Sequence, residues 1–187
     1  MKKSKTAFYI SLGCLPGFLS ARPYSFISAN RRQQLIVYDI PRYQAIDFIN
    51  GRNYFLKGDS DLLADKFLRN FHLNPSRILH RINPADSIEG LLCSNHVFVF
   101  NNKKIAVIDS AWRFNAVTEK VNADLIIISK NVSVQMAQIM EAFNCPQVVL
   151  DGSNSAWKVN KWKAEAAKLG LHCFYTVDNG ASVMNMD

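Results

Sequence analysis

Hydrophobic and polar residues alternate in short runs through the first part of the chain, which predicts β-strands joined by tight turns. Residues 34–40 (QLIVYDI) are typical of a strand that a proline closes. Residues 43–50 (YQAIDFIN) alternate, and a Gly-Arg-Asn turn then leads into 54–59 (YFLKGD), so we expect a β-hairpin. A second hairpin is expected from residues 96–100 (HVFVF) and 105–109 (IAVID).

A helical pattern lies between the two hairpins. In residues 61–71 (DLLADKFLRNF), Leu63, Phe67 and Phe71 follow one another at intervals of four residues. This spacing predicts an amphipathic helix that begins near Ser60 and packs these three side chains on the core. Residues 75–92 allow no clear assignment.

In the second half, apolar runs alternate with helical patterns. Residues 123–129 (ADLIIIS) and 147–151 (QVVLD) predict buried strands. Between them we expect a helix capped by Asn131 or Ser133, with one apolar face made of Met136, Ile139, Met140 and Phe143. A short helix is expected at 116–121 (AVTEKV).

The last part of the chain predicts one more helix and a hairpin. The helix, closed by Gly170, would turn Val159, Trp162, Ala166 and Leu169 inward and Lys158, Lys161, Lys163 and Lys168 outward. Residues 171–177 and 181–186 flank an Asp-Asn-Gly turn and predict a final hairpin. Hairpins followed by β-α-β-α-β predict a mixed α/β or α+β fold with helices over the sheet faces.

Charge and hydropathy separate residues 1–33 from a single globular domain at 34–187. Residues 1–33 hold six of the 22 Lys and Arg residues and none of the 15 Asp and Glu residues, so the remainder is nearly neutral. Such a body does not attract phosphate backbones strongly. Residues 7–21 form an uncharged apolar run. It is interpreted as a signal peptide, a lipoprotein signal with Cys14 as the lipid-bearing residue, or the end of a membrane helix. The proposed membrane anchor comprises Phe8, Tyr9, Ile10, Leu12, Leu15, Phe18 and Leu19.

The search for chemistry yields polar loops rather than a catalytic motif. The four histidines are scattered, and neither zinc-ligand spacings nor GxSxG, Walker or GxGxxG motifs occur. Cys93, Cys145 and Cys173 are expected to be buried as small hydrophobic residues. On the helix after Trp157, the lysines could suggest DNA binding, but Trp162 shares the face of Val159 and is expected in the core, and the lysines are interpreted as a solvated face of the helix.

Two polar loops follow the buried strands and supply the candidate contact residues. The strand at 123–129 ends in Ser129-Lys130-Asn131, and the strand at 147–151 leads into DGSNS. Such residues also serve as ordinary helix caps, which is the competing interpretation. The residues retained as candidate contacts are Lys130, Asn131, Asp151, Ser153 and Asn154.

The segment from ADLIIISKNVS through GASVM resembles the end of the C-terminal domain of the ComEC family, membrane channel proteins that import single-stranded DNA during natural transformation. The stretch RPYSFISANRRQQLIVYDIPRYQAIDFINGRNYFLKGD resembles the junction where that family's last membrane helix enters this domain. The resemblance implies a metallo-β-lactamase-like sandwich in trimmed form. It also implies a degenerate active site, because Asp39 alone survives in place and Ser129, Lys130 and Asn131 stand where histidines are expected.

We therefore expect a domain of a ComEC-type protein that is not an enzyme and needs no cofactor. Its expected location is the extracytoplasmic side of the plasma membrane. Its expected partners are the membrane, single-stranded DNA and the rest of the channel protein, if the chain is a fragment or a split gene product. Two alternatives remain open: a metal-dependent hydrolase built from Asp39, Asp109, Asp151 and isolated histidines, and a membrane-anchored binding module unrelated to competence.

Overall fold

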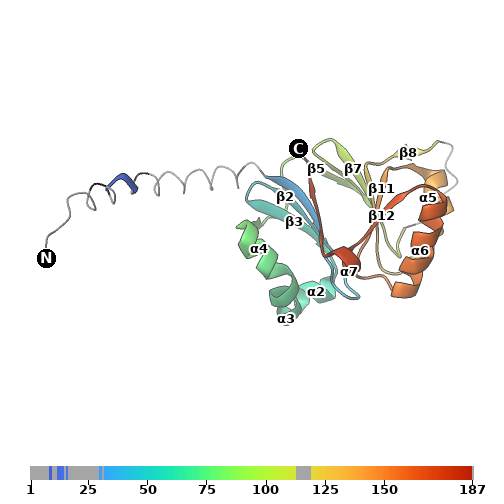
Figure 1. Cartoon of the computed structure of the whole chain (residues 1–187), viewed down its shortest axis with the longest axis horizontal. Helices are drawn as coiled ribbons and strands as arrows, with labels where there is room; N and C mark the ends of the chain where they lie inside the picture. Colours follow the sequence, from blue (N-terminus) through green and yellow to red (C-terminus); the bar gives the residue numbers. More distant parts are fainter. Residues whose placement is uncertain are drawn as a thin grey trace.

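The strands form two main β-sheets in a computed structural model that describes residues 32–112 and 119–186, with isolated positions 9, 12–14, 16 and 30 (Figure 1). The first sheet is five-stranded, in the order β13-β1-β2-β3-β4. Adjacent strands are antiparallel except β3 and β4. Its strands are β1 (Gln33–Val37), β2 (Ala45–Asn50), β3 (Asn53–Gly58), β4 (Asn83–Pro84) and β13 (Ser182–Asn185). The hairpin predicted near residue 51 is confirmed.

The second sheet is six-stranded and mixed, in the order β12-β11-β9-β7-β6-β5. The pairs β5–β6 and β6–β7 are antiparallel, and β6 and β7 form the second predicted hairpin. The strands β7, β9, β11 and β12 are parallel to one another. A small parallel pair of β8 (Val121–Asn122) and β10 (Phe143–Asn144) lies apart. The large sheet comprises β5 (Leu91–Ser94), β6 (Val97–Phe100), β7 (Lys103–Ile108), β9 (Leu125–Ile128), β11 (Gln147–Leu150) and β12 (His172–Tyr175).

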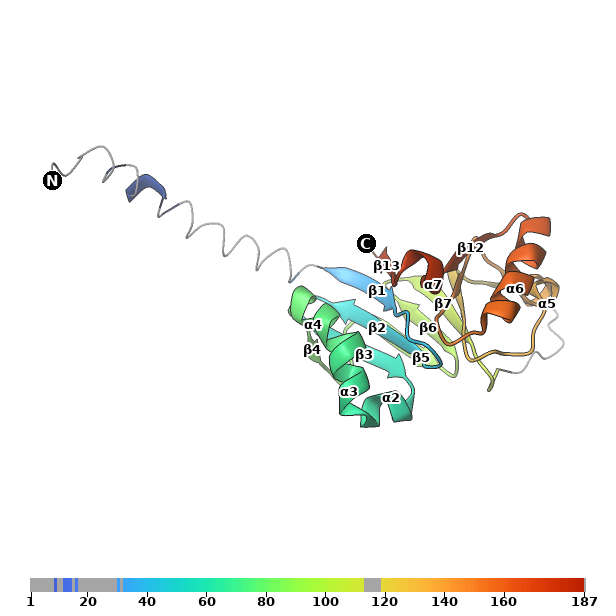
Figure 2. The same cartoon turned by 60° about the horizontal axis from the view of Figure 1, so that its bottom comes forward.

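Helices cover the outer face of each sheet, which gives a helix–sheet–sheet–helix order (Figures 1 and 2). The predicted mixed α/β architecture is confirmed. Over the first sheet lie α2 (Ser60–Ala64), α3 (Lys66–Leu68), the π-helical turn η1 (Arg69–Leu73) and α4 (Asn74–His80). Over the second lie α5 (Met136–Ala142) and α6 (Ala156–Lys168), and the short α7 (Thr176–Asn179) connects β12 with β13.

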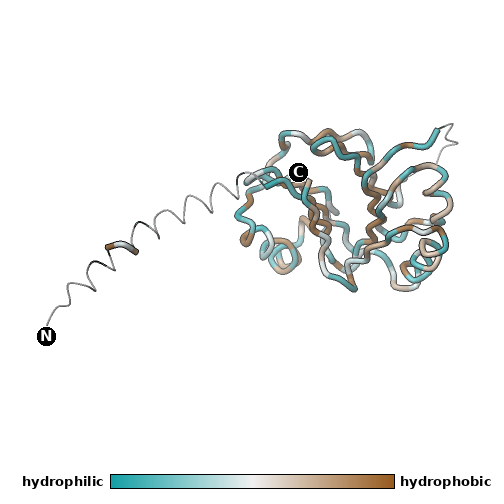
Figure 3. The backbone as a smooth tube through the Cα atoms, turned by 45° about the horizontal axis from the view of Figure 1, so that its top comes forward, coloured by the Kyte–Doolittle hydropathy of each residue, from teal (hydrophilic) through white to brown (hydrophobic). Residues whose placement is uncertain are grey.

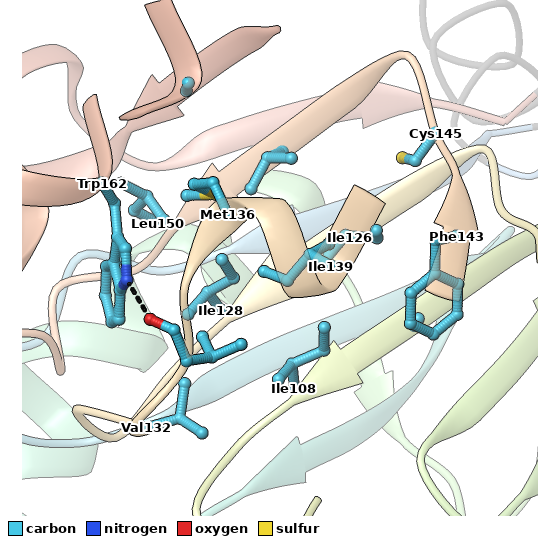
Figure 4. Packing of buried hydrophobic residues seen from close by; sticks show 14 of the residues in the cluster. Ile108, Ile126, Ile128, Val132, Met136, Ile139, Phe143, Cys145, Leu150 and Trp162 are labelled. Carbon is cyan, nitrogen blue, oxygen red and sulfur yellow. Dashed lines mark hydrogen bonds between the residues drawn. The ribbon is translucent and has the colours of Figure 1, made fainter. Parts of the chain in front are cut away.

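Aromatic rings fill the layer between the sheets. The Phe48 ring of β2 stacks on Phe98 of β6 with centroids 5.0 Å apart and meets Phe100 edge-on at 5.8 Å. Hydrophobic residues follow the strands of both sheets (Figure 3). Trp162 of α6 is buried, and its Nε1 donates to the Val134 carbonyl at 2.9 Å (Figure 4). The core position predicted for Trp162 is confirmed.

The helix predicted at 61–71 is wrong in its phase. Asp65 separates α2 from α3, and its carboxylate accepts the amides of Phe67 and Leu68. The buried side chains of this layer include Leu62 and Leu73. The three residues expected to face the core, Leu63, Phe67 and Phe71, are exposed. The cap at Asp65 resets the helical phase, so a continuous spacing of four residues does not describe one buried face.

The final predicted hairpin is also wrong. The strand β12 pairs in parallel with β11, whereas β13 pairs antiparallel with β1 in the other sheet. The Asp-Asn-Gly sequence that suggested a tight turn instead lies in and after α7, and Gly180 at φ 79° ends this helix. A two-residue turn would return the chain beside β12, but a helical turn carries it across to the first sheet.

Several smaller expectations also differ from the structure. The helix α5 begins after Gln135, whose amide binds the Gln138 side chain, rather than after Asn131 or Ser133. Phe143 is buried but belongs to β10, and Leu169 is exposed because it lies beyond the last turn of α6. The buried positions of Met136 and Ile139, of Val159 and Ala166, and the left-handed closure at Gly170 are confirmed.

Two further expectations concern loops and cysteines. Residues 116–118 of the short helix predicted at 116–121 lie outside the described residues, and Val121 is in β8 rather than in a helix. Cys145 is buried as expected, and Cys173 is half-buried. Cys93 is exposed, because it lies on β5 at the edge of the sheet, so its predicted burial is wrong.

Within the described part of the chain, no helix is long and apolar enough to cross a bilayer. Most of the proposed membrane anchor lies outside that part: Phe8, Ile10, Leu15, Phe18 and Leu19 are not described. Tyr9 and Leu12 are described only as isolated positions, so the anchor stays a prediction.

A buried ion pair joins the first sheet to its helices. The Arg77 guanidinium of α4 donates to both oxygens of Asp47 on β2, each at 3.1 Å, and Asp47 is fully buried. Tyr38 also donates to Asp47 at 2.8 Å, and the guanidinium lies 4.1 Å from the centroid of the Tyr54 ring. Burial raises the pKa of Asp47, and these donors counteract that rise. The pair therefore fixes α4 on the sheet.

Replacing Arg77 is expected to destabilise the protein strongly. Arg77→Met leaves the carboxyl of Asp47 buried without its cation, which typically costs about 3–5 kcal/mol. The matched control is Lys66→Met on the exposed side of the same layer, where a change within about 0.5 kcal/mol is expected. Urea denaturation of both variants measures the difference. Equal stabilities of the two variants would contradict this role for Arg77.

Candidate functional site

The polar loops predicted from the sequence meet at one edge of the second sheet. Leu150 at the end of β11 pairs with Ile128 at the end of the parallel strand β9. Both strands therefore release their loops on the same side, as the carboxyl ends of parallel strands do. Residues 129–131 follow β9, and residues 151–154 follow β11. The five candidate contacts, Lys130, Asn131, Asp151, Ser153 and Asn154, are gathered here.

Asp151 is the centre of this edge, and it is fully buried. Ser129 Oγ donates to its Oδ2 at 2.6 Å. Its Oδ1 accepts the Ser153 hydroxyl at 2.5 Å, the Ser153 amide at 3.1 Å and the Asn154 side-chain amide at 3.1 Å. Both carboxyl oxygens are thus occupied by protein donors, so this carboxyl group holds the two loops together.

Burial shapes the acidity of this carboxyl group. Removal from water raises the pKa of Asp151 to about 7, and the neighbouring charge of Asp59 raises it further. The hydrogen bonds from Ser129 and Ser153 lower it and offset part of the rise. Asp151 therefore changes charge near neutral pH while remaining inside the protein.

The loop after β9 turns through two consecutive left-handed residues. Lys130 has φ 57° and Asn131 has φ 50°, a backbone region that asparagine tolerates and lysine rarely adopts. The loop after β11 holds this turn, because the Lys130 amide donates to Ser153 Oγ at 2.7 Å and the Asn131 amide to Asn154 Oδ1 at 3.0 Å. These bonds offset the local strain and define the conformation of the loop.

The same turn is tied to the start of α6. Asn131 Oδ1 accepts the backbone amide of Ser155 at 2.7 Å. The Lys158 ammonium donates to the carbonyl of Asn131 and, at 3.1 Å, to that of Val132. The first turn of α6 carries Trp157, whose side chain is 70% exposed. An exposed indole therefore lies on a helix that is fastened to the loop.

The first sheet also contributes to this edge. Asp59, which follows β3, forms an ion pair with the Lys130 ammonium and accepts the Gln44 amide at 2.9 Å. Asp39, which follows β1, accepts the Thr176 hydroxyl at 3.3 Å. A Cβ placed on Gly152 would stand 2.3 Å from Asp39 Oδ1 and 2.8 Å from the Ile40 amide nitrogen. Glycine is thus required here because the loop touches the first sheet.

Asp109 lies at the same edge, because Ile108 of β7 pairs with Ile128 of the parallel strand β9, but its contacts are separate. It follows β7, its Oδ1 accepts the Ala111 amide at 2.9 Å, and its Oδ2 lies 3.6 Å from His96 Nδ1. The His96 ring meets Trp112 edge-on at 5.8 Å. Asp109 and His96 therefore form a local pair, and the contacts of Asp39 and Asp151 described above do not include them.

The donor set does not suit a metal ion. The oxygens of Asp151 are filled by hydroxyl and amide donors, and the nearby Asp59 is paired with a lysine cation, which a divalent cation would repel. Across residues 32–112 and 119–186, no three His, Cys, Asp or Glu side chains gather in a way that could hold a metal. No reaction step is therefore assigned to a metal at this edge.

Sequence reasoning missed Asp59, Lys158 and Thr176 at this edge. Asp59 carried a usable signal, because it ends the segment predicted at 54–59, as Asp151 ends the strand predicted at 147–151. Thr176 carried none, because its place beside Asp39 depends on β13 crossing to the first sheet. Of the five candidate contacts, Asn131 is exposed and Lys130 half-buried, whereas Asp151, Ser153 and Asn154 are buried.

The fold and this edge define a helix-covered α/β sandwich whose polar loops are locked around one buried carboxyl group. Residues 35–186 match the family model described as the ComEC C-terminal domain. The match covers most of the chain, which therefore belongs to the ComEC C-terminal domain family. Membership supports a general role in competence and DNA uptake and an association with membranes. No curated protein and no solved structure gives a significant match.

The raised pKa of Asp151 predicts a specific pH dependence of stability. Between the ordinary carboxyl pKa of 3.8 and about 7, the folded protein binds this proton more tightly than the unfolded chain does. Its contribution to stability is therefore largest below pH 3.8, falls as the pH rises through this window, and is constant above it. Asp151→Asn removes the titration, so the stability of the wild type relative to this variant should fall by up to about 1.4 kcal/mol per pH unit.

Urea denaturation of both proteins across this pH range measures the difference. Asp124→Asn serves as a control for general charge effects, because this exposed carboxyl group lies just before β9, where its oxygen accepts the Lys104 amide at 2.7 Å and asparagine keeps an acceptor. A constant difference between wild type and Asp151→Asn over the whole window would contradict the buried titration.

Proposed function

We propose that this chain is a non-catalytic domain of a ComEC-type competence protein that guides single-stranded DNA on the outer side of the plasma membrane. The family match supports the general role in DNA uptake. The position outside the membrane and beside the rest of the channel protein is part of the proposal. The partners would be the membrane, the channel and the incoming strand.

The proposal includes a trimmed metallo-β-lactamase-like fold. Its support is the helix–sheet–sheet–helix order, with apolar clusters between the sheets and beneath each helical layer. In such a sandwich, the loops at the strand ends are the usual place for a site. Here those loops are filled by hydrogen bonds among their own side chains, which supports a guiding rather than a catalytic role.

The observation that carries the DNA proposal is the exposed Trp157 beside cationic and amide side chains. Its indole is 70% exposed on the first turn of α6, and the adjacent Lys158 is fastened to the Asn131 loop. Exposed aromatic rings stack on unpaired bases, and nearby lysines contact phosphates. Lys161 is exposed one turn further along α6. The surface formed by Lys130, Asn131, Trp157, Lys158 and Lys161 is called the α6 surface below.

This surface suits single strands better than duplex DNA. A stacking platform needs unpaired bases, whereas a duplex presents mainly phosphates. The body is nearly neutral, with 16 basic and 15 acidic residues outside the first 33 residues, so long-range attraction to a duplex is weak. The α6 surface would therefore hold a strand through stacking and a few local charge contacts.

Replacing Trp157 is expected to weaken binding of single-stranded oligothymidine. Trp157→Ala removes one stacking contact, which is worth about 1–3 kcal/mol, so the dissociation constant should rise roughly tenfold. Trp157→Phe keeps an aromatic ring and should retain most of the affinity. Filter binding at fixed, low salt measures all three proteins. The same affinity for wild type and Trp157→Ala would remove Trp157 from the proposal.

A matched control lies at the other end of the same helix, at its C-cap. Leu169, 48% exposed just beyond the last turn of α6, can be replaced by alanine without touching the α6 surface. Loss of binding in Leu169→Ala as large as in Trp157→Ala would indicate a general effect on the helix instead. Circular dichroism of each variant checks that the fold is retained.

The non-catalytic part of the proposal has its own test. Purified protein is expected to contain no stoichiometric zinc or manganese and to leave oligonucleotides uncut in the presence of either ion. Metal analysis by mass spectrometry and gel analysis of the oligonucleotide give the two readouts. Bound metal together with nuclease activity that Asp151→Asn abolishes would establish the hydrolase alternative.

A further inference from the structure

A row of large apolar side chains stands exposed on the helical layer over the first sheet. Phe67 is 71% exposed, Phe71 67%, Ile78 75% and Leu79 77%. The rings of Phe67 and Phe71 stack on each other, with centroids 6.0 Å apart and an angle of 12° between their planes. The name hydrophobic ridge is used below for Leu63, Phe67, Phe71, Ile78 and Leu79.

The ridge is not needed to cover the first sheet. The inner side of this layer is filled by Leu62 and Leu73, which are fully buried, and by the partly buried Leu68. Exposed apolar surface costs about 25 cal/mol per Å² relative to burial, and a group of this kind usually marks an interaction site. The ridge is therefore a candidate contact surface.

The helical spacing keeps the main ridge residues near one side. Phe71 follows Phe67 by four residues, and Leu79 follows Phe67 by twelve. The π-helical turn Arg69–Leu73 accommodates about one extra residue, so twelve residues here correspond to about three α-helical turns. Phe67, Phe71 and Leu79 consequently point in similar directions from a continuous helical stretch, Lys66–His80.

Positive charge accompanies the part of the ridge in α3, η1 and α4, whereas Leu63 stands between Asp61 and Asp65. Residues 66–81 include Lys66, Arg69, Arg77 and Arg81 and contain no Asp or Glu. Arg77 is buried against Asp47, but Lys66 and Arg81 are exposed and Arg69 is half-buried. Apolar and aromatic side chains flanked by cations are the composition of helices that lie in the interface of an anionic membrane.

The ridge also lies near the point where the preceding segment joins the body. Arg32, just before β1, contacts His80 at the end of α4, with 2.5 Å between Nη1 and Nδ1. Its carbonyl accepts the Gly51 amide at 2.7 Å, which fixes the junction on the sheet. The sequence that ends at this junction contains the uncharged apolar run at 7–21 and six basic residues. The ridge thus stands on the part of the body to which this segment is joined.

We propose that the hydrophobic ridge rests on the surface of an anionic lipid bilayer and orients the body on the membrane. Phe67, Phe71 and Leu79 enter the interface between headgroups and acyl chains, and Lys66, Arg69 and Arg81 contact lipid phosphates. This contact is a second attachment, added to the apolar run that precedes β1. It does not depend on the proposed binding of DNA, which uses the α6 surface.

The test measures how close the ridge comes to lipid. Phe67→Trp places an indole on the ridge, and Leu169→Trp places one at the end of α6, over the other sheet (Figure 2). Both are made in the full chain with Trp157→Phe, so that the buried Trp162 and half-buried Trp112 form a common background. The proteins are bound to phosphatidylcholine–phosphatidylglycerol vesicles with and without brominated acyl chains, which quench indoles at the membrane interface.

Bromination is expected to remove about half or more of the added fluorescence in Phe67→Trp and little of it in Leu169→Trp. Equal quenching at the two positions would overturn the proposal, because the body would then have no preferred face on the membrane. Absent quenching at position 67 would also overturn it. If that absence coincides with concentration-dependent self-association, a second copy of the chain covers the ridge instead of lipid.

Discussion

The stacking of two sheets on one apolar layer is the constraint from which the other features follow. Phe48 of the first sheet meets Phe98 and Phe100 of the second, so the inner face of each sheet is covered by the other. Both outer faces then require helices, because neither sheet is polar there. The chain closes this arrangement by leaving the second sheet after β12 and returning to pair β13 with β1.

The stacking of the two sheets also determines the environment of the polar side chains at their common edge. Strand ends from both sheets converge there, and their polar side chains are partly shut off from water. The protein satisfies them internally: Asp151 is surrounded by donors from Ser129, Ser153 and Asn154, while Asp59 is paired with Lys130. A network closed in this way is rigid and has few free polar groups for chemistry. The network also fixes the Asn131 loop to the start of α6, which carries Trp157 in its first turn.

Local patterns in the sequence predicted much of the fold, whereas features that depend on tertiary packing could not be predicted from them. The first two hairpins and the parallel strands were accessible because side-chain periodicity and turn residues act over a few positions. Asp65 shows the limit: aspartate can be tolerated inside a helix but favours a cap, and the cap is what explains why Phe67 is exposed. The pairing of β13 with β1 joins residues far apart in sequence, so the turn-like Asp-Asn-Gly gave the wrong partner. The candidate loops were found because polar residues directly follow buried strands. The position of Thr176 could not be predicted in this way, because it depends on β13 crossing to the first sheet.

The two proposed surfaces lie on opposite helical layers, and this separation has a mechanical meaning (Figures 1 and 2). The hydrophobic ridge belongs to the layer over the first sheet, and Trp157 to the layer over the second. A body that rests on lipid through the ridge would hold α6 away from the bilayer. A strand bound at Trp157 would then avoid the anionic headgroups, which repel phosphates. In this proposed arrangement, the buried pair of Asp47 and Arg77 would fix the helix that faces the membrane to the sandwich that carries the DNA surface.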